Sequence, residues 1–95
     1  MKLYNSMGPN PHVVRMFAAE CGVGLELEEV DLMGGANRQS DYLSINPAGQ
    51  LPCLVMTNGD MLAEVTAICE YLDECADGTS LLGESAEERA SVRMW

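Results

Sequence analysis

The stretch Asn46-Pro47-Ala48-Gly49-Gln50-Leu51-Pro52-Cys53-Leu54-Val55-Met56 decides the fold of this 95-residue chain. Pro47 and Gly49 mark a turn, and the apolar run 51–56 predicts a buried strand. Pro52 stands at the entrance of that strand, where proline is tolerated because it begins the pairing. A cis bond is plausible there, although only about 5% of X-Pro bonds are cis. If Leu51-Pro52 is cis, the backbone N–H and C=O of Leu51 face outward and can pair with an extended peptide ligand.

Periodicity and turn residues predict the other elements around this strand. Strands are expected at 2–6, 25–32 and 61–63, with a hairpin turn at Asn58-Gly59 before the last of them. Helices are expected after a cap at Asn10, with Pro11 in the first helical position, then at 41–45, and then along a stripe from Ala63 to a close near Gly78. This order, βαβ-α-ββα, predicts an α/β domain. Because a right-handed crossover makes the first two strands parallel, we expect a mixed four-stranded sheet with helices on both faces.

The last residues predict a separate short helix. Ser85 and Glu88 have the spacing of a capping box, and Ala86, Ala90 and Met94 follow on one stripe. About ten residues are too few for a helix that is stable without packing. We therefore expect residues 1–78 to form one domain, and residues 79–95 to be a linker and the first turns of a further helical domain from which the chain is truncated.

The composition restricts the partners of the protein. Fifteen acidic residues against five basic ones give a net charge of −10, which favours solubility and argues against nucleic acid or an anionic membrane as a partner. No apolar run approaches the roughly 20 residues of a membrane-spanning helix, and the first residues begin a strand without a signal-peptide pattern. The cysteines form no CxxC pair, so we expect buried reduced thiols, no metal site and a cytoplasmic location. The four cysteines are Cys21, Cys53, Cys69 and Cys75.

Four motifs together resemble the amino-terminal domain of cytosolic glutathione S-transferases, and the theta-like branch of bacteria and fungi most of all. The motifs, which span about residues 1–83, are Lys2-Leu3-Tyr4, the loop Pro9-Asn10-Pro11, Asn46-Pro47-x-Gly49-x-Leu51-Pro52 and Glu64-x-x-Ala67-Ile68-x-x-Tyr71-Leu72. The resemblance implies a thioredoxin-like fold, a cis bond before Pro52, and conjugation of the glutathione thiolate to small electrophiles in detoxification. It also implies a homodimer for the full-length form.

The resemblance implies specific contacts with glutathione. Leu51, held by Pro52, pairs its backbone with the cysteinyl part, and the carboxylate of Glu64 meets the ligand's ammonium. The free N–H groups of Val65 and Thr66 receive the γ-glutamyl carboxylate at a helix start. Other polar groups and the glycyl carboxylate are assigned to Gln50 and, less directly, to Gln39 or Arg38. The alternative interpretation of Glu64 is a helix-start acid. The alternative interpretation of Gln39 and Arg38 is that they are solvated loop residues.

The catalytic group is less clearly indicated, because the loop before the first helix lacks the cysteine found in some family members. Ser6 and Asn10 are the candidates, and Asn10 can donate a hydrogen bond to a thiolate without ionising. The sequence has Val65 where many members carry serine or threonine after the acid. A non-catalytic interaction or regulatory module of the same fold is therefore the alternative function, while disulfide exchange is disfavoured.

Overall fold

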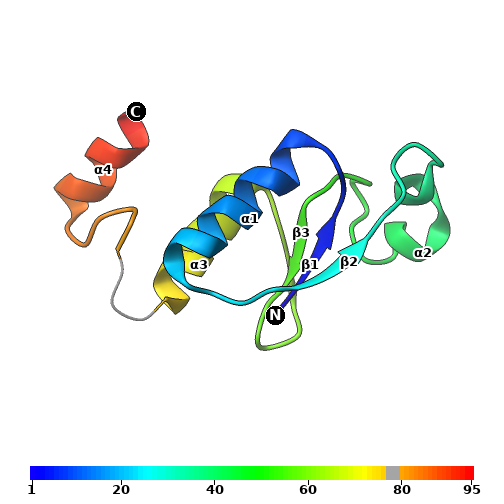
Figure 1. Cartoon of the computed structure of the whole chain (residues 1–95), viewed down its shortest axis with the longest axis horizontal. Coiled ribbons are helices and arrows are strands. Elements are labelled where there is room, and N and C mark those ends of the chain that lie inside the picture. Colours follow the sequence, from blue (N-terminus) through cyan, green and yellow to red (C-terminus); the bar gives the residue numbers. More distant parts are fainter. Residues whose placement is uncertain (77–79) are drawn as a thin grey trace.

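The computed structural model describes residues 1–76 and 80–95, and it has the predicted α/β architecture (Figure 1). Strands β1 and β2 are parallel, and β1–β3 and β3–β4 are antiparallel, in the order β2-β1-β3-β4. The mixed four-stranded sheet expected from the sequence is confirmed. The elements are β1 (Lys2–Asn5), α1 (Pro9–Cys21), β2 (Glu26–Glu29), η1 (Ala36–Arg38), α2 (Ser40–Leu43), β3 (Cys53–Val55), β4 (Met61–Ala63), α3 (Val65–Cys75) and α4 (Ala86–Met94).

Helices lie on both faces of the sheet. On one face α1 and α3 lie side by side and share a core with the two central strands (Figure 1). Leu3 of β1 belongs to that core, so the next side chain, Tyr4, points to the opposite face. There Tyr4 meets Tyr42 of α2 edge to face, with ring centroids 5.7 Å apart. The fully buried side chains of this core are Leu3, Val14, Leu54, Ile68 and Leu72. Cys53, also fully buried, precedes Leu54 on β3 and therefore faces the opposite side of the sheet.

Several predicted boundaries are wrong by a few residues. The helix α1 begins at Pro9 with Gly8 as its N-cap, so Asn10 lies in the first turn and does not cap the helix. The physical reason is that proline fits the first turn, where its missing N–H costs nothing, and Pro9 supplies the earlier start. The strand predicted at 25–32 is Glu26–Glu29, an exposed edge strand, and the strand predicted at 51–56 is Cys53–Val55. The helix α3 ends at Cys75 with Ala76 as its C-cap, a few residues before the predicted close near Gly78. Gly78 itself and the domain boundary predicted after residue 78 lie outside the described residues.

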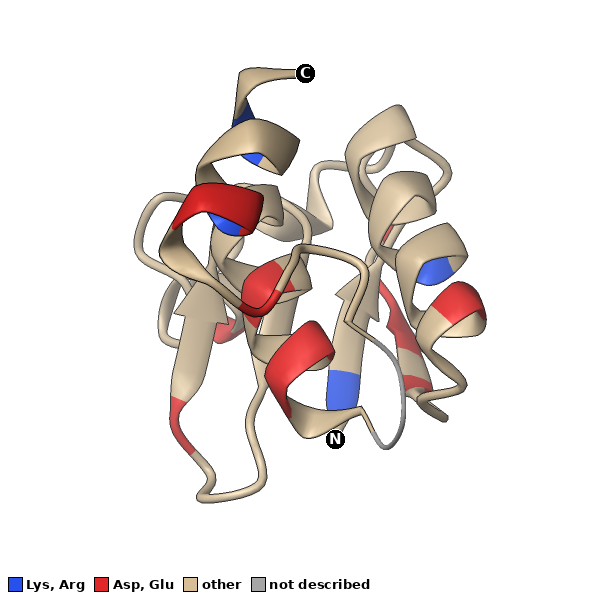
Figure 2. Cartoon of the chain, turned by 90° about the vertical axis from the view of Figure 1, so that its left-hand side faces the viewer, with Lys and Arg blue, Asp and Glu red and all other residues tan. Residues whose placement is uncertain are grey.

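The helix α4 is attached to α3 by charged groups. Arg89 contacts Glu70 at 2.9 Å and Glu74 at 2.8 Å, and Arg93 contacts Glu70 at 3.1 Å. Figure 2 shows α4 carrying both basic and acidic positions near the acidic end of α3. No residue of α4 is buried, so ion pairs and not an apolar interface hold this helix. The predicted capping box is present: Ser85 Oγ accepts from the Glu88 N–H, and Glu88 accepts from the Ser85 N–H.

The buried carboxylate of Asp73 fixes the chain that leads to α4. One oxygen accepts from the Leu81 N–H at 2.8 Å, and the other accepts from the Leu82 N–H at 3.4 Å. Leu82 is itself buried. The end of α3 and the approach to α4 are therefore joined at one side chain.

All four cysteines are in the reduced form, without disulfide bonds, but they are not all buried. Burial raises the pKa of the Cys53 and Cys69 thiols. Cys75 is exposed because it lies in the last turn of α3, beyond the core, so its predicted burial is wrong. Within the described residues, no group of three or more His, Cys, Asp or Glu side chains could hold a metal ion, and none of the helices there is long and apolar enough to span a membrane.

Candidate functional site

A pocket lies where the loop before β3 meets the first turns of α1 and α3. It brings together most of the residues that the sequence predicts for the site, although they come from three separate parts of the chain. Its lining residues are Asn10, Asn46, Ala48, Gln50, Leu51, Pro52, Ala63, Glu64 and Val65. Asn46, Ala48 and Ala63 are additions to the predicted set.

The Leu51-Pro52 peptide bond at this pocket is cis. Pro52 is buried, whereas Leu51 is half-buried and lines the pocket. The paired residues of β3 begin at Cys53, so Leu51 lies just before the sheet pairing. A backbone unit in this position can pair with an extended ligand that runs alongside it.

Two buried side chains hold the residue that precedes Leu51. The Tyr42 hydroxyl and the Asn46 amide both donate to the carbonyl oxygen of Gln50, at 2.6 Å and 2.9 Å. Tyr42 and Asn46 are only 4% and 6% exposed. Burial, and secondarily the nearby Cys53, raises the pKa of Tyr42 to about 12, so its hydroxyl remains a donor at neutral pH. The backbone at Gln50 is therefore fixed from inside the protein.

The preceding turn also depends on a glycine. Gly49 has φ of +66°, which glycine adopts without cost. A Cβ there would lie 3.1 Å from the Asn37 carbonyl oxygen and 3.3 Å from the Leu43 side chain. The Asn37 amide donates to the Gly49 carbonyl oxygen at 2.8 Å, which ties η1 to the turn.

Glu64 has the one positive φ found among the non-glycine residues that the structure describes. Its φ of 75° and ψ of 126° place it in a sparsely populated region, at the N-cap position of α3. The side chain caps no helix N–H, and it is exposed and lines the pocket. Glu64 therefore lies at the helix start, where its alternative interpretation as a helix-start acid places it, but its side chain makes no capping hydrogen bond. Glu64 and Val65, the residues at which α3 begins, therefore both line this pocket.

The two candidate catalytic residues lie in different places. Asn10, in the first turn of α1, lines the pocket together with Leu51 and Glu64. Ser6 is buried, accepts from the Gly8 N–H at 3.3 Å, and lines a neighbouring apolar hollow with Met7. Only Asn10 therefore lies among the pocket-lining residues.

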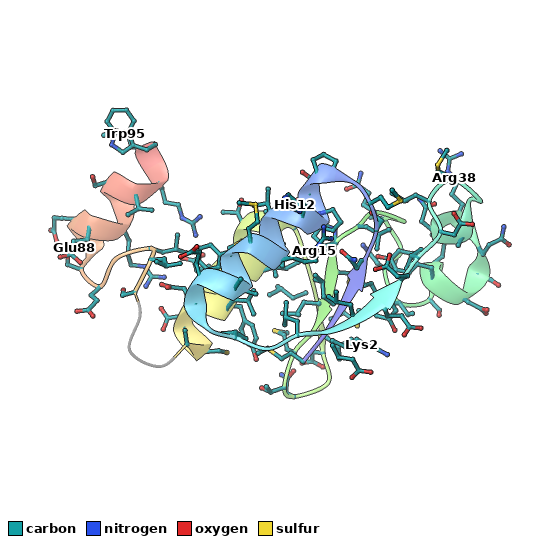
Figure 3. The ribbon with its side chains drawn as sticks, viewed as in Figure 1. Lys2, His12, Arg15, Arg38, Glu88 and Trp95 are labelled. Atoms are coloured by element: carbon teal, nitrogen blue, oxygen red, sulfur yellow. The ribbon has the colours of Figure 1, made fainter. Side chains whose placement is uncertain are left out.

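Three other candidates lie apart from the pocket lining. Gln39 lines a different hollow with Tyr4 and Tyr42. Arg38 is exposed at the end of η1, near α2 (Figure 3). Thr66 is exposed, and its backbone follows Val65 in the first turn of α3. For Thr66, this position is consistent with the predicted contact through its backbone N–H at the start of α3 and not with a contact through its side chain.

The sheet order β2-β1-β3-β4, the covering helices and the cis-proline before β3 define a thioredoxin-like domain. Residues 1–74 match the family described as glutathione S-transferase, N-terminal domain. The chain belongs to this family.

Known proteins show the same relationship. Glutathione S-transferase F10 of Arabidopsis thaliana is 44% identical over 79 residues, which cover 80% of this chain and 36% of that protein. The structure of a glutathione S-transferase domain-containing protein of Marinobacter aquaeolei VT8 has a TM-score of 0.92 at 42% identity, covering 99% of this chain and 47% of that one. A glutathione transferase homolog from Sulfitobacter, solved with bound glutathione, has a TM-score of 0.90 at 26% identity, covering 98% and 45%. The chain thus spans less than half the length of each of these relatives.

Proposed function

We propose that this chain binds glutathione in the pocket between the loop before β3 and the start of α3, and that it acts as a glutathione S-transferase. The observation that carries the proposal is that one pocket contains the backbone of Leu51, held by cis Pro52, and the carboxylate and helix start at Glu64 and Val65. A γ-linked tripeptide with a free ammonium and a carboxylate at one end matches these groups. The family membership favours this function over a non-catalytic interaction module.

In this assignment each end of the ligand meets a group of opposite character. The ligand ammonium pairs with the Glu64 carboxylate, and the γ-glutamyl carboxylate accepts from the Val65 and Thr66 N–H groups at the positive end of α3. The cysteinyl part pairs with the Leu51 backbone. The Gln50 side chain contacts the ligand's polar groups, and Gln39 is a more remote candidate for the glycyl carboxylate.

The reaction requires that the glutathione thiol be ionised, because the thiolate is the nucleophile. A thiol of pKa about 8.5 is only a few per cent thiolate at neutral pH, and lowering its pKa by two units needs about 2.7 kcal/mol of preferential stabilisation of the anion. One hydrogen bond to the anion and the positive end of a helix supply energies of this size. Asn10, in the first turn of α1, is the assigned donor to the thiolate, and Ser6 is the second candidate.

The wider biology is part of the same proposal. We infer a cytoplasmic detoxification enzyme that acts on small electrophiles, works as a homodimer and uses no metal. In this proposal residues 1–78 form the glutathione-binding domain, and 79–95 lead toward a helical domain.

Titration of glutathione into ¹⁵N-labelled protein tests the binding. We expect the amides of Leu51, Glu64 and Val65 to shift, and Glu64→Gln to weaken binding. Glu84→Gln removes an equal charge from an exposed loop and serves as the matched control. An absence of shifts up to millimolar glutathione would contradict the proposal. Turnover of chlorodinitrobenzene, measured on this chain and on any longer natural form, separates catalysis from binding.

A further inference from the structure

The side chain of Arg15 reaches from the second turn of α1 back to the loop that joins β1 to α1. One guanidinium nitrogen donates to the Ser6 carbonyl oxygen at 3.3 Å and also to the Asn5 side-chain oxygen. The other terminal nitrogen lies 3.1 Å from Nδ1 of His12, and Figure 3 shows these two side chains together on α1. The guanidinium of Arg15 therefore contacts the end of β1, the following loop and the first turn of α1.

This contact continues into the sheet. Asn5, which is 5% exposed, donates its amide to the Glu29 carboxylate of β2 at 2.5 Å. Asn5 thus lies between the carboxylate and the guanidinium. The groups that contact Arg15 are accordingly Asn5 of β1, His12 of its own helix, and the Ser6 carbonyl. Glu29 is linked to Arg15 indirectly, through the side chain of Asn5.

The charge of Arg15 is not used in an ion pair within residues 1–76 and 80–95. The ion pairs of that part of the chain are made by Arg89 and Arg93. Lys2 lies over the Tyr4 ring, and Arg38 is exposed on η1. Arg15 is therefore the cation that contacts the loop containing Ser6. This loop leads directly into α1, whose first turn carries Asn10.

We propose that Arg15 is a positioning residue for thiol activation: it fixes the Ser6–Gly8 loop against the start of α1 and supplies the positive charge that offsets the thiolate of bound glutathione. This inference rests on the proposed function. In a chain of net charge −10, each further negative charge is disfavoured by the field of the whole protein. A partly buried guanidinium with a fixed fork counters that field at the loop and the start of α1, because fewer solvent dipoles screen it there.

The test is the apparent pKa of the glutathione thiol in the complex, read from the ultraviolet absorbance of the thiolate across a pH series. We expect Arg15→Gln to raise this pKa by about one unit and, at a pH below the thiol pKa of both complexes, to lower kcat by about tenfold with the Kd for glutathione changed by less than about twofold. Arg93→Gln removes the same charge from α4 and should leave the thiol pKa unchanged. Arg15→Lys keeps the charge without the fork, so it should recover most of the pKa change but not the full kcat.

The outcomes separate the two proposals. If wild-type protein does not bind glutathione, the proposed function fails. If wild-type protein binds glutathione and lowers its thiol pKa, and Arg15→Gln does the same with unchanged kcat, the role of Arg15 is overturned alone. Should Arg15→Gln lose its cooperative thermal unfolding, Arg15→Lys decides the matter: an unchanged kcat in that folded variant overturns the positioning role.

Discussion

The Tyr42 hydroxyl donates a 2.6 Å hydrogen bond to the carbonyl oxygen of Gln50, and this bond links the one buried side chain of α2 to the residue that precedes Leu51. The same oxygen accepts from Asn46. Because Gln50 directly precedes Leu51, a displacement of the Gln50 carbonyl also displaces the Leu51 backbone, which we expect to pair with glutathione.

Tyr42→Phe should weaken glutathione binding without changing the pKa of the bound thiol. Loss of one hydrogen bond costs about 1 kcal/mol, which corresponds to about a fivefold increase in Kd if the whole loss falls on binding. Calorimetric titration measures the change. Tyr71→Phe is the matched control, because among the described residues the Tyr71 hydroxyl bonds only to Thr57, which does not line the pocket. Equal losses in the two variants would show that the Tyr42 bond has no special relation to the pocket.

Tyr42 should also make stability depend on pH in the alkaline range. Its folded-state pKa of about 12 lies above the ordinary value of 10.0, so the folded protein favours the protonated form. The corresponding stability is complete below pH 10 and is lost as pH rises toward 12. We expect the difference in unfolding free energy between wild type and Tyr42→Phe, measured by urea denaturation, to shrink across this range. A difference that stays constant would contradict this assignment.

Glu64 should show a conflict between stability and binding. Glycine adopts a φ of 75° without strain, so Glu64→Gly should raise the unfolding free energy by about 1 kcal/mol and weaken glutathione binding by tenfold or more. Glu64→Gln keeps the strained backbone and removes only the charge, and it should weaken binding at unchanged stability. Thermal melts and titrations of both variants check this. If the two variants are equally stable, the backbone at residue 64 is not strained.

The attachment of α4 should fail in acid. Hydrogen bonds from Arg89 first, and then from Arg93, hold the pKa of Glu70 below its ordinary value of 4.5. The attachment should therefore be complete above that pH and be lost as pH falls through the lowered value. Fluorescence anisotropy of Trp95, which follows α4 and points away from the domain (Figure 3), should drop over this range and with added salt.

Glu70→Gln should lower the Trp95 anisotropy already at neutral pH and remove the acid transition. Glu87→Gln, which changes an exposed acid of α4 that makes no ion pair in the described chain, should behave like wild type. Identical acid transitions in the two variants would assign the attachment to other groups, of which the Asp73 carboxylate is the first to consider.

The fold was largely predictable because its signals are local. The 61–63 strand, the Ser85–Glu88 capping box and the element order follow from periodicity and turn residues, which act within a few positions. The boundaries at Pro9 and at β2 were not predictable in the same way. Two prolines in one first turn leave the start of α1 open, and pairing at a sheet edge is set by the neighbouring strand and not by alternation.

The site was predictable where it depends on the backbone, and less so where it depends on packing. Leu51, Pro52, Glu64 and Val65 meet in the pocket because turn and cap residues fix their chain path. The roles of Tyr42 and Asn46 were missed, because their bonds to Gln50 depend on how α2 packs. The Asn-Pro pair at 46–47 was the available signal, since asparagine before a turn commonly bonds the backbone two residues on, as it does here to Ala48.

The acidic edge strand β2 has a consequence for how copies of the chain can meet. Glu26, Glu28 and Glu29 are all exposed along a strand that has an unpaired side (Figure 2). Two such edges placed together would align carboxylates at the spacing of neighbouring strands, where like charges repel. Continuous sheets across two molecules are thereby disfavoured at this border, and a symmetric pairing of subunits must form through another surface.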